Sequence, residues 1–307
     1  MLGLQGRRCS VKGALRRSGA GPLAASGGRA HICAMRDLPP DAEVVLPPVP
    51  RAYPGVNWEG LKTLYLREVR RFIKVGMQTL AAPVVTALLY MLVFVVAVGG
   101  GRRLHGVDYG TFVAPGLVMM QILSNAFANS SSSLLQAKFN GLMGDFLTPP
   151  LSPAEHVAGF GAGAATRGIL VGAVSLLAVL PFARLSVAQP WAILYFGVSA
   201  ALIMAFVGIM AGLWAEKFDH IAAVTNFVIM PMTFLSGTFY LVERLPEPFR
   251  TASYYNPFFY LIDGFRYGFV GHAESNLAVG VAMTAALVLA TGWACLRLFQ
   301  VGYKIKT

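Results

Sequence analysis

Six long stretches of this sequence contain almost no charged residue. Five of them carry no Asp, Glu, Lys, Arg or His at all, and the sixth is interrupted by a single arginine, Arg167. About 20 apolar residues in a helix cross the ~30 Å hydrocarbon core of a bilayer, so each stretch is long enough to span a membrane. The pattern predicts an all-α membrane protein with six transmembrane helices, within residues 75–101, 109–137, 157–183, 185–215, 221–242 and 275–296.

A basic amphipathic helix is predicted before the first span, with Asn57 as its N-cap. Its apolar positions follow helical spacing and are Trp58, Leu61, Tyr65, Val69 and Phe72. Its basic positions occupy much of the remaining surface and are Lys62, Arg67, Arg70, Arg71 and Lys74. Such a helix is expected to lie flat at the cytoplasmic membrane surface, although the pattern also fits a solvated helix packed against another protein.

The connection between the second and third spans predicts a short helix, a rigid break and a new helix. Apolar residues at i, i+3, i+4 and i+7 form the short amphipathic helix: Phe139, Leu142, Met143 and Phe146. Pro149 and Pro150 stop it. Ser152, Pro153 and Glu155 then form a capping box with proline at the first helical position. This geometry is able to transmit force from a cytoplasmic partner, and a simple tight turn between helices is the alternative.

The second span carries a polar stripe at steps of three or four residues. Its members are Gln121, Asn125, Asn129, Ser132 or Ser133, and Gln136. Amides in hydrocarbon need hydrogen-bond partners, so the stripe is expected to face a neighbouring helix, a dimer partner or a water-filled path. The fifth span repeats the pattern more weakly, at Thr225, Asn226, Thr233 and Ser236.

The third span combines small residues with one charge. Gly159 and Gly163, then Gly168 and Gly172, allow a neighbouring backbone to approach closely. Arg167 is costly at membrane depth, which makes it a candidate functional residue. Snorkelling towards the cytoplasm, or a bond to a helix carbonyl, is the structural alternative.

The region between the fifth and sixth spans is aromatic and only partly apolar. Its uncharged part, residues 251–262, is too short to cross a bilayer. Asn256 and Pro257 supply a cap and a first-turn proline for a helix that reaches Asp263 and Arg266. We expect re-entrant or interfacial helices at the outer face, with an ordinary aromatic belt as the alternative.

Charge sets the expected orientation of the chain. Of its 307 residues only 13% are charged and 56% are hydrophobic, and the net charge is +11. Six crossings place both ends on one side, and 18 of the 25 Lys and Arg residues fall on that side against six on the other. The positive-inside bias therefore predicts that both ends are cytoplasmic. No nucleic-acid partner is expected, because no separate folded module presents the basic residues.

The sequence before the first helix lacks periodicity. Residues 1–50 are rich in Gly, Ala, Arg and Pro, so we expect a disordered extension there. No acidic residue occurs before Asp37, which fits either a transit peptide or a start placed too early, with Met35 as the initiator; we prefer the second. The predicted order is then the extension, a cytoplasmic amphipathic helix over 51–75 and a transmembrane domain over 76–307.

Motifs for catalysis and metal binding are missing from the sequence. It contains no G-x-x-x-x-G-K-[ST], no H-E-x-x-H and no G-x-S-x-G. The five histidines are dispersed, and Cys9, Cys33 and Cys295 are widely scattered. No nucleophile with a base, metal site or disulfide framework is predicted. We therefore expect no catalytic residue, no cofactor and no metal in this chain, and any ATP must be used by a partner.

The order of these motifs resembles the membrane subunit of the ABC-2 family of ABC exporters, which includes permeases for drugs, lipo-oligosaccharides and polysaccharides. The likeness covers residues 56–303. It rests on Arg70-Arg71-Phe72, on LTPPLSP at 147–153, on FLSGTFY at 234–240 and on YNPFFY at 255–260 followed by DGFRY at 263–267. Each piece is loose alone, and their order and spacing across six spans make the match specific.

This resemblance implies a half-transporter: two permease subunits pair, and two separate subunits that bind ATP and magnesium dock beneath them. The coupling helix seated on the ATPase would contain Phe139, Leu142, Met143 and Phe146. The interface helix beside it would contain Trp58, Arg67, Arg70 and Arg71. The translocation path would be flanked by Gln121, Asn125, Asn129, Thr225 and Asn226. The re-entrant outer gate would contain Asn256, Pro257, Asp263 and Arg266.

The sequence thus predicts the permease subunit of an ATP-driven exporter in a bacterial inner membrane, not itself an enzyme and paired with a second copy in the simplest case. Apolar spans with sparse amides suit an amphipathic or lipid-like cargo. A secondary carrier or channel not driven by ATP is the alternative, although proton-relay charges and internal repeats are missing. A membrane scaffold, in which the polar stripe only binds helices, is a third possibility.

Overall fold

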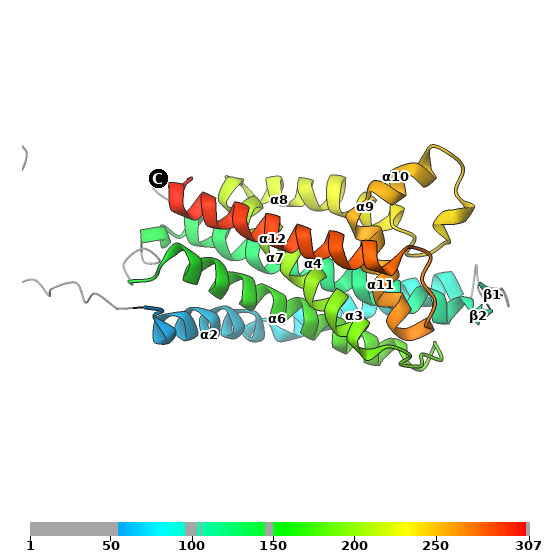
Figure 1. Ribbon diagram of the computed structural model, residues 1–307. Helices are drawn as coiled ribbons and strands as arrows, with labels where there is room; N and C mark the ends of the chain where they lie inside the picture. Colours follow the sequence, from blue (N-terminus) through cyan, green and yellow to red (C-terminus); the bar gives the residue numbers. More distant parts are fainter. Residues whose placement is uncertain (1–54, 96–102, 105, 145–149, 305–307) are drawn as a thin grey trace, which may run out of the picture. The chain divides into compact units, whose positions relative to one another are not determined.

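A computed structural model of the chain describes residues 55–95, 103–104, 106–144 and 150–304. These residues belong to one compact unit that begins at Arg51. The extension expected over residues 1–50 lies outside the described residues. Within them the only strands form a two-residue hairpin, in which β1 (Arg103–Leu104) pairs antiparallel with β2 (Val107–Asp108). The remaining elements are helices (Figure 1).

In the part of the chain that the structure describes, six helices are long and apolar enough to cross a membrane, so the predicted six-span, all-α architecture is confirmed. The fifth span is composite, because a π-helical turn, η3, joins two shorter α-helices. The first four spans are α3 (Gly76–Leu92, with the apolar helix continuing to Val95), α4 (Tyr109–Phe139), α6 (Pro153–Val179) and α7 (Pro190–Trp214). The last two are α8 (Phe218–Val224) with η3 (Thr225–Ile229) and α9 (Met230–Leu235), and α12 (Leu277–Val301).

The predicted helix starts are confirmed by their caps. The Asn57 side chain accepts a hydrogen bond from Gly60 N at 2.9 Å and caps α2 (Trp58–Lys74). Ser152 and Glu155 form the reciprocal capping box at the start of α6. Asn256 accepts from Phe258 N at 3.1 Å and starts α11 (Pro257–Val270), which follows the shorter helices η4 (Val242–Arg244) and α10 (Phe249–Tyr255).

Helix α4 is the centre of the bundle, and most of its side chains are buried between α6, α7 and α11. Glycines let α6 approach it closely. A Cβ at Gly168 would lie 2.9 Å from the Ile122 carbonyl oxygen, and one at Gly172 would overlap the Ile122 side chain. The small-residue pair predicted at these positions therefore packs against α4, where dispersion contacts rather than burial from water hold spans together.

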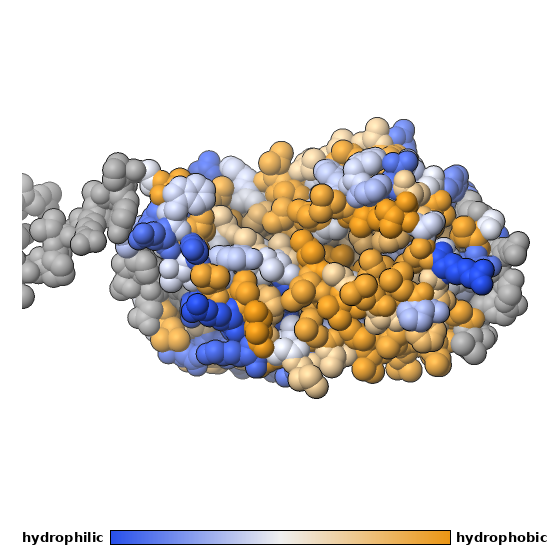
Figure 2. Space-filling model, turned by 90° about the horizontal axis from the view of Figure 1, so that it is seen from below, coloured by the Kyte–Doolittle hydropathy of each residue, from blue (hydrophilic) through white to orange (hydrophobic). Residues whose placement is uncertain are grey.

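The outward faces of the spans are apolar. Large hydrophobic side chains such as Leu89, Leu177, Leu194 and Leu289 are exposed. Figure 2 shows that hydrophobic residues cover most of one face and that hydrophilic residues gather at the end where α2 lies. An apolar, lipid-facing surface with polar residues towards its ends follows from this distribution.

Helix α2 runs lengthwise beside the first half of α6 rather than across the bundle (Figure 1). Asn57 N donates to Glu155 Oε1 at 2.5 Å, so one carboxylate joins the starts of both helices. A Cβ at Gly159 would meet the Leu64 side chain at 2.6 Å, which shows how closely the two helices approach. The buried stripe of α2 is Leu64, Glu68 and Phe72. Trp58, expected on the apolar face, is 71% exposed; the location of α2 at a membrane surface stays a prediction.

The helix predicted to start at Phe139 does not start there. Phe139 is the last residue of α4, and Asn140 caps that helix. Gly141 then adopts a left-handed φ of 67°, which breaks the regular spacing, before helical residues resume at Met143. Phe146 lies outside the described residues.

The fifth span ends earlier than its apolar sequence indicates. Leu235 is its last helical residue, and Gly237 turns the chain with a φ of 72°. The apolar residues that follow pack under α3 and α4 instead of continuing the helix: Phe239 stacks on Phe94 with ring centroids 4.0 Å apart, and its carbonyl accepts a hydrogen bond from Tyr109. The residues of this loop are hydrophobic because they are buried against other helices, and not because they span the membrane.

The start of α2 and the end of α12 lie at the same end of the bundle (Figure 1). The His156 ring at the start of α6 stacks on Phe299 near the end of α12, with ring centroids 5.8 Å apart. Because α6 starts beside α2, this contact brings both ends of the described chain together, as an even number of spans requires.

Candidate functional site

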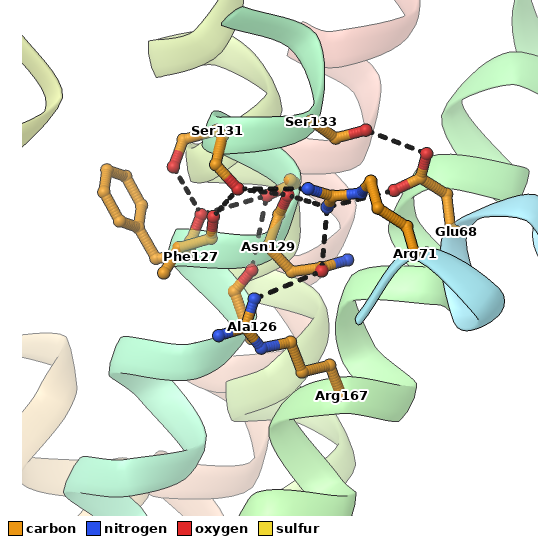
Figure 3. A network of polar contacts seen from close by, with 11 residues as sticks. Glu68, Arg71, Ala126, Phe127, Asn129, Ser131, Ser133 and Arg167 are labelled. Carbon is orange, nitrogen blue, oxygen red and sulfur yellow. Dashed lines mark hydrogen bonds and ion pairs between the residues drawn. The ribbon is translucent and has the colours of Figure 1, made fainter. Parts of the chain in front are cut away.

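Two arginines from different helices converge on one asparagine inside the bundle. Arg71 of α2 donates to the backbone oxygen of Asn129 at 2.7 Å and to its side-chain Oδ1 at 2.9 Å. Arg167 of α6 reaches the same Oδ1 at 3.5 Å. Figure 3 shows Arg71 and Arg167 approaching Asn129 of α4 from two sides. The polar stripe of α4 and the single charge of the third span, noticed separately in the sequence, thus belong to one network.

A buried carboxylate supports this network from α2. Glu68 is only 1% exposed, accepts a hydrogen bond from Ser133 at 2.8 Å and lies 3.3 Å from Arg71. Gly163 makes room for it, because a Cβ there would lie 2.6 Å from Glu68 Cβ. Glu68 was not identified from the sequence. The sequence does place Glu68 one helical turn before Arg71, on a helix with few acidic residues. This spacing could have predicted an ion pair between the two side chains.

The network forms one wall of a cavity of about 780 Å³ between α2, α3, α4 and α6. Gln121, Asn125 and Gln136 of the predicted stripe line it, together with Arg71 and Arg167. Asn125 Nδ2 donates to the Gln121 carbonyl one turn earlier, at 3.0 Å, so its side-chain oxygen is left for other partners. Three of the four amides that sequence analysis grouped therefore share a cavity, whereas Asn129 is not among its lining residues.

The polar residues of the fifth span are not brought to this cavity. Only Phe218 of that span lines it. Thr225 donates to the Ile221 carbonyl within its own helix, and Asn226 is exposed. Both residues lie in the π-helical turn just before Pro231. Proline disturbs the helix one turn before it, which accounts for the wider turn, and such turns are frequent at functional sites.

A second polar cluster lies at the opposite end of the bundle, around Arg266 of α11. Arg266 donates to the carbonyl oxygens of Phe112 at 3.2 Å and Gly237 at 2.6 Å, and pairs with Glu274 at 3.1 Å. Asp263 accepts from the backbone of Glu274 at 3.0 Å, so it anchors the loop between α11 and α12. The predicted gate residues Asp263 and Arg266 are therefore buried and connect α4, α11 and two loops.

Asn256 and Glu274 complete the connections at this end. Asn256 Nδ2 donates to the Met232 carbonyl at 2.7 Å and to Ser236 at 2.8 Å, which ties the start of α11 to the end of the fifth span. Pro257 follows as the first helical residue of α11.

Burial raises the pKa of Glu274 from 4.5 to about 7, against the lowering effect of Arg266. The cluster therefore contains a carboxyl that changes charge near neutral pH.

The predicted coupling residues differ in exposure. Phe139 is 58% exposed and stacks on Phe218, with ring centroids 5.4 Å apart. Leu142 is 38% exposed, whereas Met143 is buried in a cluster that includes Leu64 of α2. Only Phe139 and Leu142 are thus available to a partner among the described members of this set.

The basic residues predicted on α2 are distributed over its surface. Arg71 belongs to the buried network, while Arg67 and Arg70 are exposed. Both of these exposed residues line a second cavity, of about 610 Å³, together with Arg71 and Arg167. The helix therefore presents its positive charge along one side and into the bundle.

Comparison with known proteins identifies relatives over most of the described chain. The family model described as "ABC-2 type transporter" matches residues 59–270. The inner membrane transport permease YadH of Escherichia coli K12 is 33% identical over 252 residues, which cover 81% of this chain and 98% of the relative. Nodulation protein J of Rhizobium leguminosarum is 25% identical over 244 residues in biovar viciae, covering 76% of this chain and 90% of the relative, and 29% identical over 235 residues in biovar trifolii, covering 72% and 85%.

Proposed function

The chain belongs to the ABC-2 type transporter family, and we propose that it is the permease subunit of an ATP-driven exporter in a bacterial inner membrane. A separate ATP-binding subunit, which holds ATP and magnesium, drives it, and a second permease subunit completes the path. Both ends of the chain lie in the cytoplasm. Family membership, the name of the Escherichia coli relative and the six spans support this assignment.

The observation that carries the proposal is the polar cavity in an otherwise apolar bundle. Buried amides and two arginines line about 780 Å³ of space beside α3 and α4. Polar groups at membrane depth are costly, so their concentration in one cavity fits a path for cargo better than helix packing alone. An amphipathic cargo fits this arrangement, because the outward faces of the same helices are apolar.

A second permease subunit is supported by the exposed amide of the fifth span. Asn226 is exposed, and its neighbour Phe227 is 81% exposed. An amide facing hydrocarbon lacks hydrogen-bond partners, and another protein surface or a water-filled path would supply them. Pairing along this span would place Asn226 and Thr225 at the path between two copies.

Docking of the ATP-binding subunit is supported by an exposed aromatic pair at the end of the bundle where the chain ends meet. Phe139 at the end of α4 and Phe218 at the start of α8 are 58% and 51% exposed and stack face to face. Aromatic side chains of this kind anchor protein interfaces. The exposed Leu142 extends the same surface.

Affinity purification of the tagged chain in mild detergent tests the proposal. We expect an ATP-binding subunit and a second permease chain to co-purify, and the complex to hydrolyse ATP while the separated chain does not. Recovery of the chain alone, together with nucleotide-independent transport in vesicles, would contradict the ATP-driven function and support the carrier alternative.

A further inference from the structure

We propose that Arg71 and Arg167 form a binding site for the phosphate group of an anionic amphiphile. The inference rests on the proposed function only in taking this amphiphile as the cargo class. Both arginines line the 610 Å³ cavity and the 780 Å³ cavity, so the two spaces adjoin at the arginine pair. Val75 and Gln136 also line both cavities.

The arginine pair carries more positive charge than its surroundings balance. Two guanidinium groups share one neutral acceptor, Asn129 Oδ1, at 2.9 and 3.5 Å. The one carboxylate that the described residues place against them is Glu68, which also accepts from Ser133. The two guanidinium groups lie close enough to bond to the same oxygen, so their positive charges repel each other. An anion between or beside them would relieve this repulsion.

Unused donors of both arginines point to the same ligand. Arg71 Nε and Arg167 Nε are buried and have no hydrogen-bond partner among the described residues. Buried polar groups normally have partners, and Glu68 Oε2 and Asn129 Nδ2 of the same network lack one too, so the contacts around the two cations are incomplete. Guanidinium groups recognise phosphate through paired N–H donors, which makes a phosphate oxygen the matching acceptor.

The surroundings of the pair also favour an anion of more than one charge. Arg67, Arg70 and Lys74 of α2 line the smaller cavity, and none of its described lining residues is acidic. A phosphate monoester carries about −1.5 to −2 charges near pH 7, which such a basic cavity stabilises better than a single carboxylate.

The larger cavity gives the rest of an amphiphile a place. It extends from the arginines along α3, where Ala82 and Pro83 line it, towards Gln121. Val85 and Leu89 of the same helix are 62% and 59% exposed, so α3 also presents an apolar surface. A phosphate headgroup at Arg71 and Arg167 would therefore leave its apolar chains beside α3, next to the bilayer.

Equilibrium binding to the purified chain in nanodiscs, without any ATP-binding subunit, tests the site. The probe is a short-chain phosphatidic acid, the control is diacylglycerol with the same chains, and inorganic phosphate is the competitor. We expect phosphatidic acid to bind more tightly than diacylglycerol and inorganic phosphate to compete only at much higher concentration. Equal binding of the two lipids would overturn the proposal, and equal competition by inorganic phosphate would assign the site to free phosphate instead of an amphiphile.

Substitutions distinguish binding at Arg71 and Arg167 from a general effect of the protein's positive charge on an anionic lipid. Arg71→Gln and Arg167→Gln should each raise the dissociation constant for phosphatidic acid at least about tenfold, because each removes a charged hydrogen-bond donor. Arg250→Gln, in exposed α10 at the other end of the bundle, is the matched control and should leave it unchanged. Unchanged affinity in both cavity variants would contradict the proposal.

Two further variants guard against misfolding. Arg71→Lys keeps the charge and should retain more affinity than Arg71→Gln. Arg70→Gln combined with Lys74→Gln alters only exposed side chains and should weaken binding several-fold; no change would contradict a role for the basic rim. The binding assay uses the chain alone, so a failure to bind phosphatidic acid would contradict the arginine site and would leave the proposed exporter function unaffected. Binding of phosphatidic acid without ATP-driven transport would contradict the exporter function and would leave the arginine site unaffected.

Discussion

At the residue scale, Asn129 and Asn125 illustrate two different uses of an amide in a membrane helix. Asn129 is fully buried and accepts from two arginines, so it holds helices α2, α4 and α6 together. Asn125 bonds only within its own helix and lines the large cavity. The first amide thus joins three helices, and the second lines the cavity that we propose as the path.

Leucine substitutions should separate these roles. Asn129→Leu leaves Arg71 and Arg167 without their shared acceptor, and we expect a loss of about 2 kcal/mol in stability, seen as a lower melting temperature in detergent. Asn125→Leu should leave the melting temperature nearly unchanged and reduce transport by the reconstituted complex. Equal melting temperatures for both variants, or full transport by Asn125→Leu, would contradict these assignments.

Glu274 gives the cluster around Arg266 a predicted pH dependence. Burial raises its pKa from 4.5 to about 7, so the folded protein favours the protonated carboxyl. The stability that this contributes is complete below pH 4.5 and is lost as pH rises through 7, amounting to about 3 kcal/mol at most. Melting temperatures of the wild type should fall over this window, and those of Glu274→Gln should not. Parallel pH profiles for the two proteins would exclude Glu274 as the titrating group.

Several of these residues are visible in the sequence and others are not. Amides repeating along one span and a lone arginine in another mark Asn129 and Arg167, because polar groups in hydrocarbon stand out against their neighbours. Glu68 is hidden among surface charges on α2, and it is buried because Gly163 of α6 lets the two helices approach closely. The pairing of a particular amide with a particular arginine depends on how the helices pack. Local sequence patterns do not contain this information.

At the element scale, the spans and helix starts were predictable because they depend on local chemistry. Long uncharged stretches predict crossings, and the caps at Asn57, Ser152 and Asn256 depend on one or two neighbouring residues. The fifth span ends inside its predicted stretch, 221–242, because the residues after Gly237 are apolar for another reason, namely burial under α3 and α4. The start of the expected helix at Phe139 was wrong because α4 continues to that residue.

The revised position of Phe139 changes how the expected coupling surface is tested. Met143 is buried, so replacing it would damage the fold. We expect Phe139→Asp combined with Leu142→Asp to abolish co-purification of the ATP-binding subunit, because the change places charge in an aromatic docking surface. Phe249→Asp, an equally exposed phenylalanine at the other end of the bundle, is the control and should retain the partner. Retention of the partner by the double variant would contradict the docking assignment.

At the scale of the whole molecule, two polar sites lie at opposite ends of an apolar bundle. The arginine site and the cavity beside it lie towards the end where the chain ends meet, and the Arg266 cluster ties the loops at the other end. Helix α4 passes through both, since Asn129 belongs to the first and the Phe112 carbonyl to the second. Movement of α4 would therefore affect both sites together.

Cargo flux in proteoliposomes shows whether this chain transports only together with an ATP-binding subunit. Vesicles would contain either this chain alone or the chain with its ATP-binding subunit, and a fluorescent short-chain phosphatidic acid would report transport, with ATP added or omitted. We expect flux only when the ATP-binding subunit and ATP are both present. Equal flux through the chain alone, without nucleotide, would contradict this expectation.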